Sequence, residues 1–182
     1  MFDPTIFDNL KVVLEGRLYD VDAENRIRIS GREDIVDLAA MSRKFCMRFA
    51  RNGGTCQAAV TLASGLTDFA AERRIARLAD RRPGADLLLT LDLPRERRAH
   101  CAELHDYLTR LWGEEADIRH ELTVLLQPEA NEGPSEAPET YRIQLKFRQR
   151  IDESHIEELE QWLDIAVMCL VYADEGRNFV QG

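Results

Sequence analysis

Four arginines at helical spacing are the clearest group of residues in this sequence that could bind a ligand. They are Arg73, Arg74, Arg77 and Arg81. The surrounding segment, residues 67–81, predicts a helix with Ala71, Ile75 and Leu78 on its core face, so the arginines fall on the opposite side. A guanidinium group binds phosphate and carboxylate with paired hydrogen bonds, so this stripe predicts a site for a small anion or a nucleotide. The alternative is a solvated face whose arginines pair with nearby carboxylates.

A second group combines a thiol with imidazoles. Cys101 and His105 stand four residues apart on one predicted helix, with His100 beside them. This spacing can bring a thiolate against an imidazolium or supply two metal ligands. Two ligands do not complete a metal site, and the others would have to come from His120, His155 or a distant carboxylate. The structural alternative is that Cys101, which lies among leucines, acts as a small hydrophobic residue.

Familiar catalytic and cofactor motifs are absent from the sequence. It contains no GxSxG, no HExxH, no P-loop and no GxGxxG before a helix. Gly53-Gly54 reads as a hairpin turn, because no helix begins after it to bind a phosphate. We therefore expect no cofactor and no metal, and the sequence favours a protein that is not an enzyme.

Composition and charge narrow the partners and the compartment. The chain has 182 residues and a net charge of −9, which argues against binding to nucleic acid or acidic membranes. The start of the chain shows no secretory signal, and the longest apolar run, 165–173, is too short to span a bilayer. None of the four cysteines forms a CxxC pair. We expect a cytoplasmic protein whose cysteines are thiols.

The first half of the chain predicts strands at 9–19 and 26–29, then a short helix at 30–41 that begins at an S-x-x-E capping box. A hairpin follows, with strands at 43–51 and 55–64 around Gly53-Gly54. Its register places Phe45 opposite Leu62, Met47 opposite Val60 and Phe49 opposite Ala58. All six side chains are apolar and share one face.

The second half predicts a central strand at 85–91 and a helix that begins at Pro94, capped by Asp92, and continues to Trp112. Strands at 119–127 and 140–150 follow. Between them, residues 128–139 are acidic, rich in Pro and Gly, and poor in large apolar residues, so we expect a mobile acidic loop. The last helix begins at Asp152 or at a Ser154–Glu157 capping box.

These elements indicate an α+β fold with a largely antiparallel sheet and helices packed on one face. Without the first strand, each half reads βαββα, which resembles the ferredoxin-like βαββαβ arrangement in topology. We expect one compact domain, 1–182, made of two similar halves, 1–84 and 85–182. This fold hosts many unrelated functions, so the resemblance implies no activity.

The last helix carries the main functional hypothesis. Its segment 165–172 is apolar around the whole circumference, with Val167 and Val171 on one stripe and Met168 and Tyr172 on the next. A sheet covers only one side of a helix, so we expect a second subunit to cover the other. The favoured function is a homodimeric interaction or regulatory protein that binds another protein or a small anion. Anion or nucleotide binding by the arginine stripe is the alternative, and an enzyme with a dispersed site near His100, Cys101 and His105 is the third.

Overall fold

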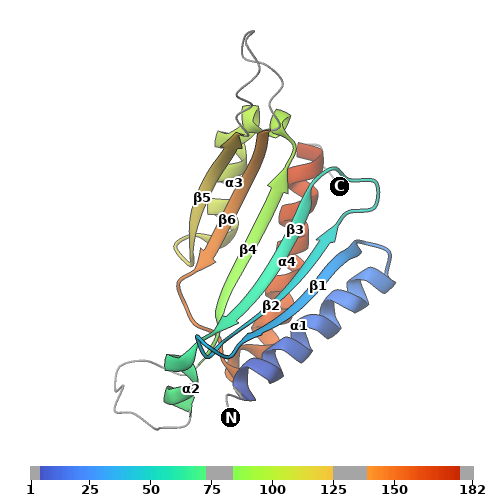
Figure 1. Ribbon diagram of the computed structural model, residues 1–182. Coiled ribbons are helices and arrows are strands. Elements are labelled where there is room, and N and C mark those ends of the chain that lie inside the picture. The colour runs from blue at the N-terminus through green and yellow to red at the C-terminus, as the bar shows by residue number, and fades with distance from the viewer. Residues whose placement is uncertain (1–4, 73–83, 125–138, 177–182) are drawn as a thin grey trace, which may run out of the picture.

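The computed structural model describes residues 5–72, 84–124 and 139–176, and it is an α+β fold built on one six-stranded antiparallel sheet (Figure 1). The order across the sheet is β1-β2-β3-β4-β6-β5. The helices are α1 (Thr5–Ala23), α2 (Leu66–Glu72), α3 (Cys101–Trp112) and α4 (Ile156–Glu175), with short 3-10 turns at Arg95–His100 and Glu153–His155. The strands are β1 (Arg28–Asp37), β2 (Ser42–Ala50), β3 (Gln57–Ser64), β4 (Asp86–Leu93), β5 (Ala116–Val124) and β6 (Glu139–Phe147).

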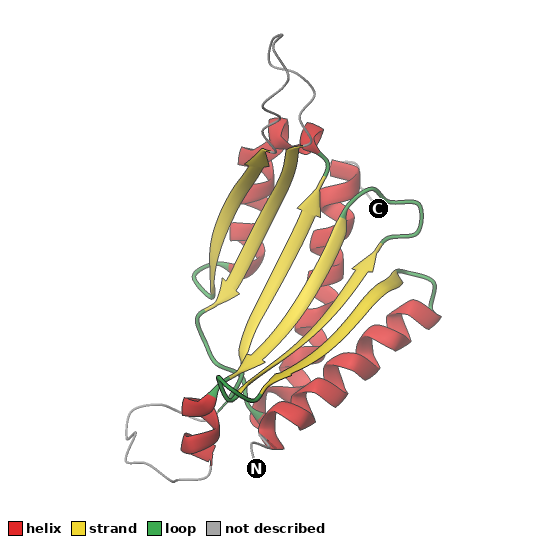
Figure 2. Cartoon of the chain, in the orientation of Figure 1, coloured by secondary structure: helices red, strands yellow, loops and turns green. Residues whose placement is uncertain are grey.

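In the described part of the chain, helices pack on one face of the sheet, as the sequence predicts, and none packs on the other, which we call the uncovered face (Figure 2). Helix α4 lies along the middle of the covered face, where it contacts β4, with α1 on one flank and α3 on the other. Between them lies one core of buried side chains from all the strands except β1 and from these three helices. No helix in the described part of the chain is both long and apolar enough to cross a membrane.

Helix α4 is apolar on all sides because elements of the same chain cover most of its surface. The sheet covers one side of it, and α1 and α3 cover the two flanks. Val167 is 3% exposed, and Tyr172 is 7% exposed and stacks on Tyr107 at 3.6 Å between ring centroids. Val171 is half-buried, and Met168 is 49% exposed on the outer side. The second layer that the sequence requires is therefore supplied largely by helices of the same subunit.

The predicted register of the β2–β3 hairpin is confirmed at every pair. Phe45 lies opposite Leu62, Met47 opposite Val60 and Phe49 opposite Ala58, all on the helix-covered face. The connection is longer than the predicted strand ends at 51 and 55 imply, because strand pairing ends at Ala50 and Gln57, and the N–H of Gly54 donates to the carbonyl of Arg51. Of the two glycines only Gly53 has a positive φ, at +74°. The tip is wider than a two-residue turn because the carboxylate of Asp174 draws two of its N–H groups toward α4.

The elements of the second half follow in the predicted order, β4, α3, β5, β6 and α4. Strand β6 lies between β4 and β5 and is antiparallel to both, so β4 and β5 run parallel and α3 crosses between them. The predicted cap of the α3 segment is wrong, because Asp92 stays in β4 and pairs with Arg142. At the start of the last helix, Asp152 is the capping residue: its carboxylate accepts from the N–H of Ser154, and no Ser154–Glu157 box forms.

Two predicted elements of the first half are wrong, so the two halves do not share one element order. Residues 9–19 belong to helix α1, whose buried residues recur every three or four positions: Phe7, Leu10, Leu14, Leu18 and Val21. Residues 30–37 belong to strand β1, not to a helix. Ser30 and Glu33, the residues of the predicted capping box, instead bond to neighbouring strands. The Ser30 hydroxyl accepts from Gln57 on β3, and Glu33 pairs with Arg48 on β2.

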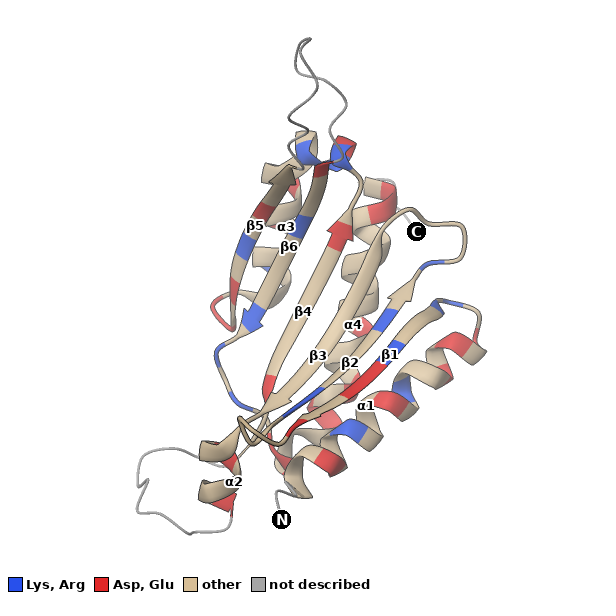
Figure 3. Ribbon diagram, viewed as in Figure 1, with Lys and Arg blue, Asp and Glu red and all other residues tan. Residues whose placement is uncertain are grey.

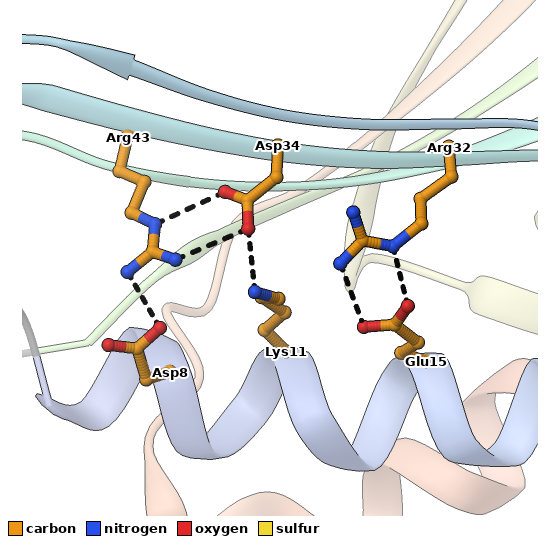
Figure 4. A network of polar contacts seen from close by, with 6 residues as sticks. All are labelled: Asp8, Lys11, Glu15, Arg32, Asp34 and Arg43. Carbon is orange, nitrogen blue, oxygen red and sulfur yellow. Dashed lines mark hydrogen bonds and ion pairs between the residues drawn. The ribbon is translucent and has the colours of Figure 1, made fainter.

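Strand β1 is held against α1 by charged side chains rather than by apolar ones (Figure 4). Asp34 accepts from Lys11 at 2.6 Å and from Arg43 at 3.2 Å. Farther along, Arg32 makes a bidentate pair with Glu15. This polar layer explains why β1 lacks the apolar alternation that would have identified it as a strand.

Candidate functional site

Three aromatic rings from distant parts of the chain meet where α3, β6 and α4 converge. Trp112 ends α3, Phe147 ends β6 and Trp162 lies on the second turn of α4. Phe147 meets each indole edge-on at 4.9 Å between ring centroids, and the two indoles lie 5.6 Å apart. Edge-to-face packing of this kind favours rigid rings, so the cluster has a fixed shape.

These rings form one wall of a cavity of about 530 Å³. The remaining lining residues are Leu87, Glu114, Glu115, Arg148, Gln149, Ile151, His155, Glu158, Leu159, Gln161 and Ile165. An apolar wall with a polar rim and a volume of this size is typical of sites that hold a small ligand or the side chains of a bound peptide.

The rim of the aromatic cavity is acidic. Glu114, Glu115 and Glu158 are exposed and make no ion pair with any residue in the described ranges. The one arginine of the rim, Arg148, is neutralised by Asp117 at 2.7 Å. An occupant would therefore meet apolar rings below and uncompensated negative charge above.

Trp162 also carries an unused hydrogen-bond donor. Its side chain lines the cavity, the residue is only 9% exposed, and its indole Nε1 is buried with no partner among the described residues. A buried donor without an acceptor costs free energy, on the order of 1–3 kcal/mol.

The thiol and imidazole group of the sequence forms a separate hydrogen-bonded chain. The hydroxyl of Tyr141 lies 2.6 Å from Nδ1 of His120, and Nε2 of His120 lies 3.1 Å from Nδ1 of His105. Cys101 joins through a longer contact, 3.5 Å from its sulfur to Nδ1 of His120. His100 does not join it, since it pairs with Glu103 in the next turn.

Two members of this hydrogen-bonded group have shifted pKa values. Burial lowers the pKa of His120, and the neighbouring His105 lowers it further. Burial likewise raises the pKa of Tyr141, with Cys101 adding to the effect. The phenol therefore donates to Nδ1 of a neutral His120, whose Nε2–H donates to His105.

This arrangement does not suit a thiol nucleophile or a metal ion. The Tyr141 hydroxyl occupies the Nδ1 lone pair that would have to accept the proton of Cys101. Cys101 and His105 contact opposite nitrogens of His120, and no group of three or more His, Cys, Asp or Glu in the described ranges could hold a metal ion. The remaining cysteines are free and buried, and burial raises the pKa of Cys56 and of Cys169 to about 12.

The His120 chain predicts loss of stability in mild acid. Because the pKa of His120 is lowered in the folded state, the unfolded chain takes up a proton first as pH falls below about 6.5. The free energy of unfolding should therefore decrease from about pH 7.5 to about pH 5, as measured by urea titration. His120→Gln should flatten this decrease of stability with falling pH. His100→Gln removes an exposed imidazole that is not part of the hydrogen-bonded group, so it should leave the decrease unchanged. Equal slopes in wild type and His120→Gln would contradict the assignment.

The other residues predicted from the sequence fall into two groups. Arg73, Arg74, Arg77 and Arg81 lie outside the described residues, as does the acidic loop up to residue 138. Its last residue, Glu139, opens β6 and pairs with Arg95 at 3.2 Å. Of the interface candidates only Met168 is exposed.

The aromatic cavity itself was not predicted. Trp112 and Phe147 lie in separate predicted elements, and nothing in the sequence joins them to Trp162. The one signal that could have found the site is that the chain has only two tryptophans, and both line this cavity.

Comparison with known proteins gives no relative: no family model, no curated protein and no solved structure matches this chain.

Proposed function

We propose that this protein is a non-enzymatic interaction protein that binds a segment of a partner protein in the aromatic cavity. The observation that carries the proposal is the pairing of a rigid aromatic wall with an acidic rim, at Glu114, Glu115 and Glu158, in a cavity of about 530 Å³. Aromatic residues of this kind are frequent anchors in protein interfaces.

The charge of the rim defines the partner segment. Three carboxylates without an ion pair attract Lys and Arg, and indole faces bind cations as well. We therefore expect an apolar or aromatic anchor side chain flanked by basic residues.

Intrinsic fluorescence tests this proposal directly, because both tryptophans of the chain line the cavity. Peptides selected from a random library of about 12 residues should carry an apolar anchor with flanking Lys or Arg, and should change the tryptophan emission on binding. Glu114→Lys/Glu158→Lys should weaken these peptides at least about tenfold, since it reverses two rim charges.

The matched control is Glu103→Lys/Glu157→Lys, which makes the same charge change on α3 and α4 at positions that do not line the cavity. It should leave peptide affinity within about twofold, apart from a screened long-range effect. Enrichment of acidic peptides, or binding that the rim variant leaves unchanged, would contradict the proposal. Binding of tetramethylammonium without binding of any peptide would assign the cavity to a small cation instead.

We also propose that the protein forms a homodimer, although fewer residues support this than the sequence suggested. Met168 is exposed on the outer side of α4, with half-buried Ile165 and Val171 one turn away on either side. This stripe supports a homodimer through α4, and a monomeric mass by light scattering at micromolar concentration would rule against it. We also propose a cytoplasmic location, supported by the four free cysteines.

We further propose that the second half is a ferredoxin-like unit. The insertion of β6 between the parallel pair β4 and β5, with α3 as the crossover, supports this for residues 85–175. A solved relative in which the same three strands take another order would count against it.

A further inference from the structure

We propose that the uncovered face of the sheet holds a binding site for a small organic polyanion, with Lys44, Arg119 and Lys146 as its cationic ligands. These residues lie on β2, β5 and β6 and line one hollow of about 330 Å³. The site lies on the face opposite the helices and shares only Leu87 with the aromatic cavity. It uses none of the arginines of residues 73–81.

Lys and Arg occur on β1, β2, β5 and β6 but not on β3 or β4 (Figure 3), and those of the uncovered face divide into two sets. Arg48, Arg142 and Arg148 are each engaged by a carboxylate, at 2.7, 2.6 and 2.7 Å respectively. Lys44, Arg119 and Lys146 make no ion pair with any residue in the described ranges, and all three are exposed. Apart from Arg28 on β1, the cations of this face without an ion pair in the described ranges are the three that line the hollow.

The shape of the hollow follows from strand register. Lys44 pairs with Ala63 on β3, Thr61 pairs with Leu88, and Leu88 pairs with Lys146. The middle of the hollow is lined by the uncharged side chains of Ala63, Thr61 and Leu88. The longer side chains of the lysines and the arginine surround it. Thr61 is 7% exposed, and its hydroxyl can donate to an anion at the floor.

The two carboxylates of the hollow do not cancel its charge. Asp86 is paired with Arg150 at 2.9 Å, and Asp117 is paired with Arg148. Neither of those arginines lines the hollow. The lining therefore keeps an excess of positive charge in a chain whose net charge is −9.

The spacing of the cations selects a ligand with more than one negative group. Four strand-to-strand steps separate β2 from β5, about 19 Å between backbones, and flexible side chains shorten that span only in part. One phosphate cannot contact all three cations, whereas a chain of phosphate or carboxylate groups can bridge them. The ligand class is a small molecule with two or more such groups.

Thermal unfolding of the full chain tests the site, with inorganic tripolyphosphate, citrate and monophosphate at matched ionic strength. Tripolyphosphate or citrate at about 10 mM should raise the melting temperature by about 3 °C, and added salt should reduce the shift. Binding by only one of the two assigns phosphate or carboxylate as the recognised group. Monophosphate should shift it less.

The variant Lys44→Gln/Lys146→Gln should lower polyanion affinity at least about tenfold, measured by calorimetry. Arg28→Gln/Arg98→Gln is the control, since it removes the same charge at exposed cations that neither form ion pairs with described residues nor line the hollow. All four substitutions are at exposed positions, and circular dichroism checks that both variants fold. Equal losses in both variants, an equal response to monophosphate, or no shift in wild type would overturn the site. None of these outcomes bears on the aromatic cavity.

Discussion

Replacing Asp174 with alanine is expected to lower the free energy of unfolding by about 2–3 kcal/mol, measured by urea titration. Asp174 lies at the end of α4, and its side chain is 2% exposed. One carboxylate oxygen accepts from the backbone N–H groups of Thr55 and Cys56, at 2.8 and 2.9 Å, and from the Thr55 hydroxyl. The substitution leaves these donors without their acceptor and releases the tip of the β2–β3 hairpin from the helix.

Gly54 makes this prediction specific, because a Cβ at that position would overlap the second carboxylate oxygen of Asp174. Gly54→Ala should therefore cost about 2 kcal/mol in wild type and far less in Asp174→Ala, where the carboxylate is gone. Gly53→Ala is the matched control. Gly53 has open space around its Cβ position but a φ of +74°, so its alanine variant should cost about 1 kcal/mol in both backgrounds. Additive losses for Gly54→Ala and Asp174→Ala would show that the two positions do not meet.

Replacing Asp34 with alanine is expected to cost about 2 kcal/mol of stability through the contact between α1 and β1. Asp34 bridges Lys11 and Arg43, and the three side chains are 19%, 16% and 15% exposed. Without the carboxylate, Lys11 loses its ion pair and Arg43 keeps only the pair with Asp8. Replacing Lys11, Asp34 and Arg43 together with Met, Leu and Met should cost less than Asp34→Ala alone, because the one charge left without its partner, Asp8, is 37% exposed.

Glu33→Ala is the control for this cluster. Glu33 is the next residue on β1 but faces the uncovered side, where it pairs with Arg48 at 2.7 Å with both side chains about 40% exposed. An exposed pair of this kind contributes less than about 1 kcal/mol. A loss at Glu33 equal to that at Asp34 would contradict the difference we assign to burial.

The Asp34 effect should also depend on pH. Burial by itself would raise the pKa of Asp34, but the hydrogen bonds and charges of Arg43 and Lys11 outweigh it and lower the pKa. The stabilisation is therefore present above the unfolded-state pKa of about 3.9 and is lost as pH falls through the lower folded-state pKa. Wild type and Asp34→Ala should converge in stability below that range.

The β2–β3 hairpin and the second half show what local sequence could determine. In the hairpin, six apolar residues alternate around a glycine turn, and only one register puts all of them on one face. In the second half, the apolar pattern of each segment by itself predicts its helix or strand, and β4, α3, β5, β6 and α4 follow in the predicted order.

Helix α1 and strand β1 depended on partners that the sequence does not reveal. Leu10, Val12 and Leu14 fit a strand as well as a helix, and only packing against α4 and the sheet selects the helix, which leaves Val12 66% exposed. Strand β1 directs Arg32 and Asp34 toward α1, where Glu15 and Lys11 compensate them. The local sequence gives the charge of a side chain but not its partner, so the S-x-x-E pattern at Ser30 and Glu33 predicts a helix where the structure has a strand.

The candidate sites needed the tertiary structure for the same reason. The sequence determined that the chain is acidic, that α4 is apolar all round and that no familiar catalytic motif is present. Only the fold decided that α1 and α3 cover α4, that Trp112, Phe147 and Trp162 meet, and that Lys44, Arg119 and Lys146 line one hollow without an ion pair to any described residue. Each of these depends on side chains from elements that are distant in sequence. Strand order and helix packing bring these side chains together, and a periodic pattern within one segment of sequence cannot predict contacts between distant segments.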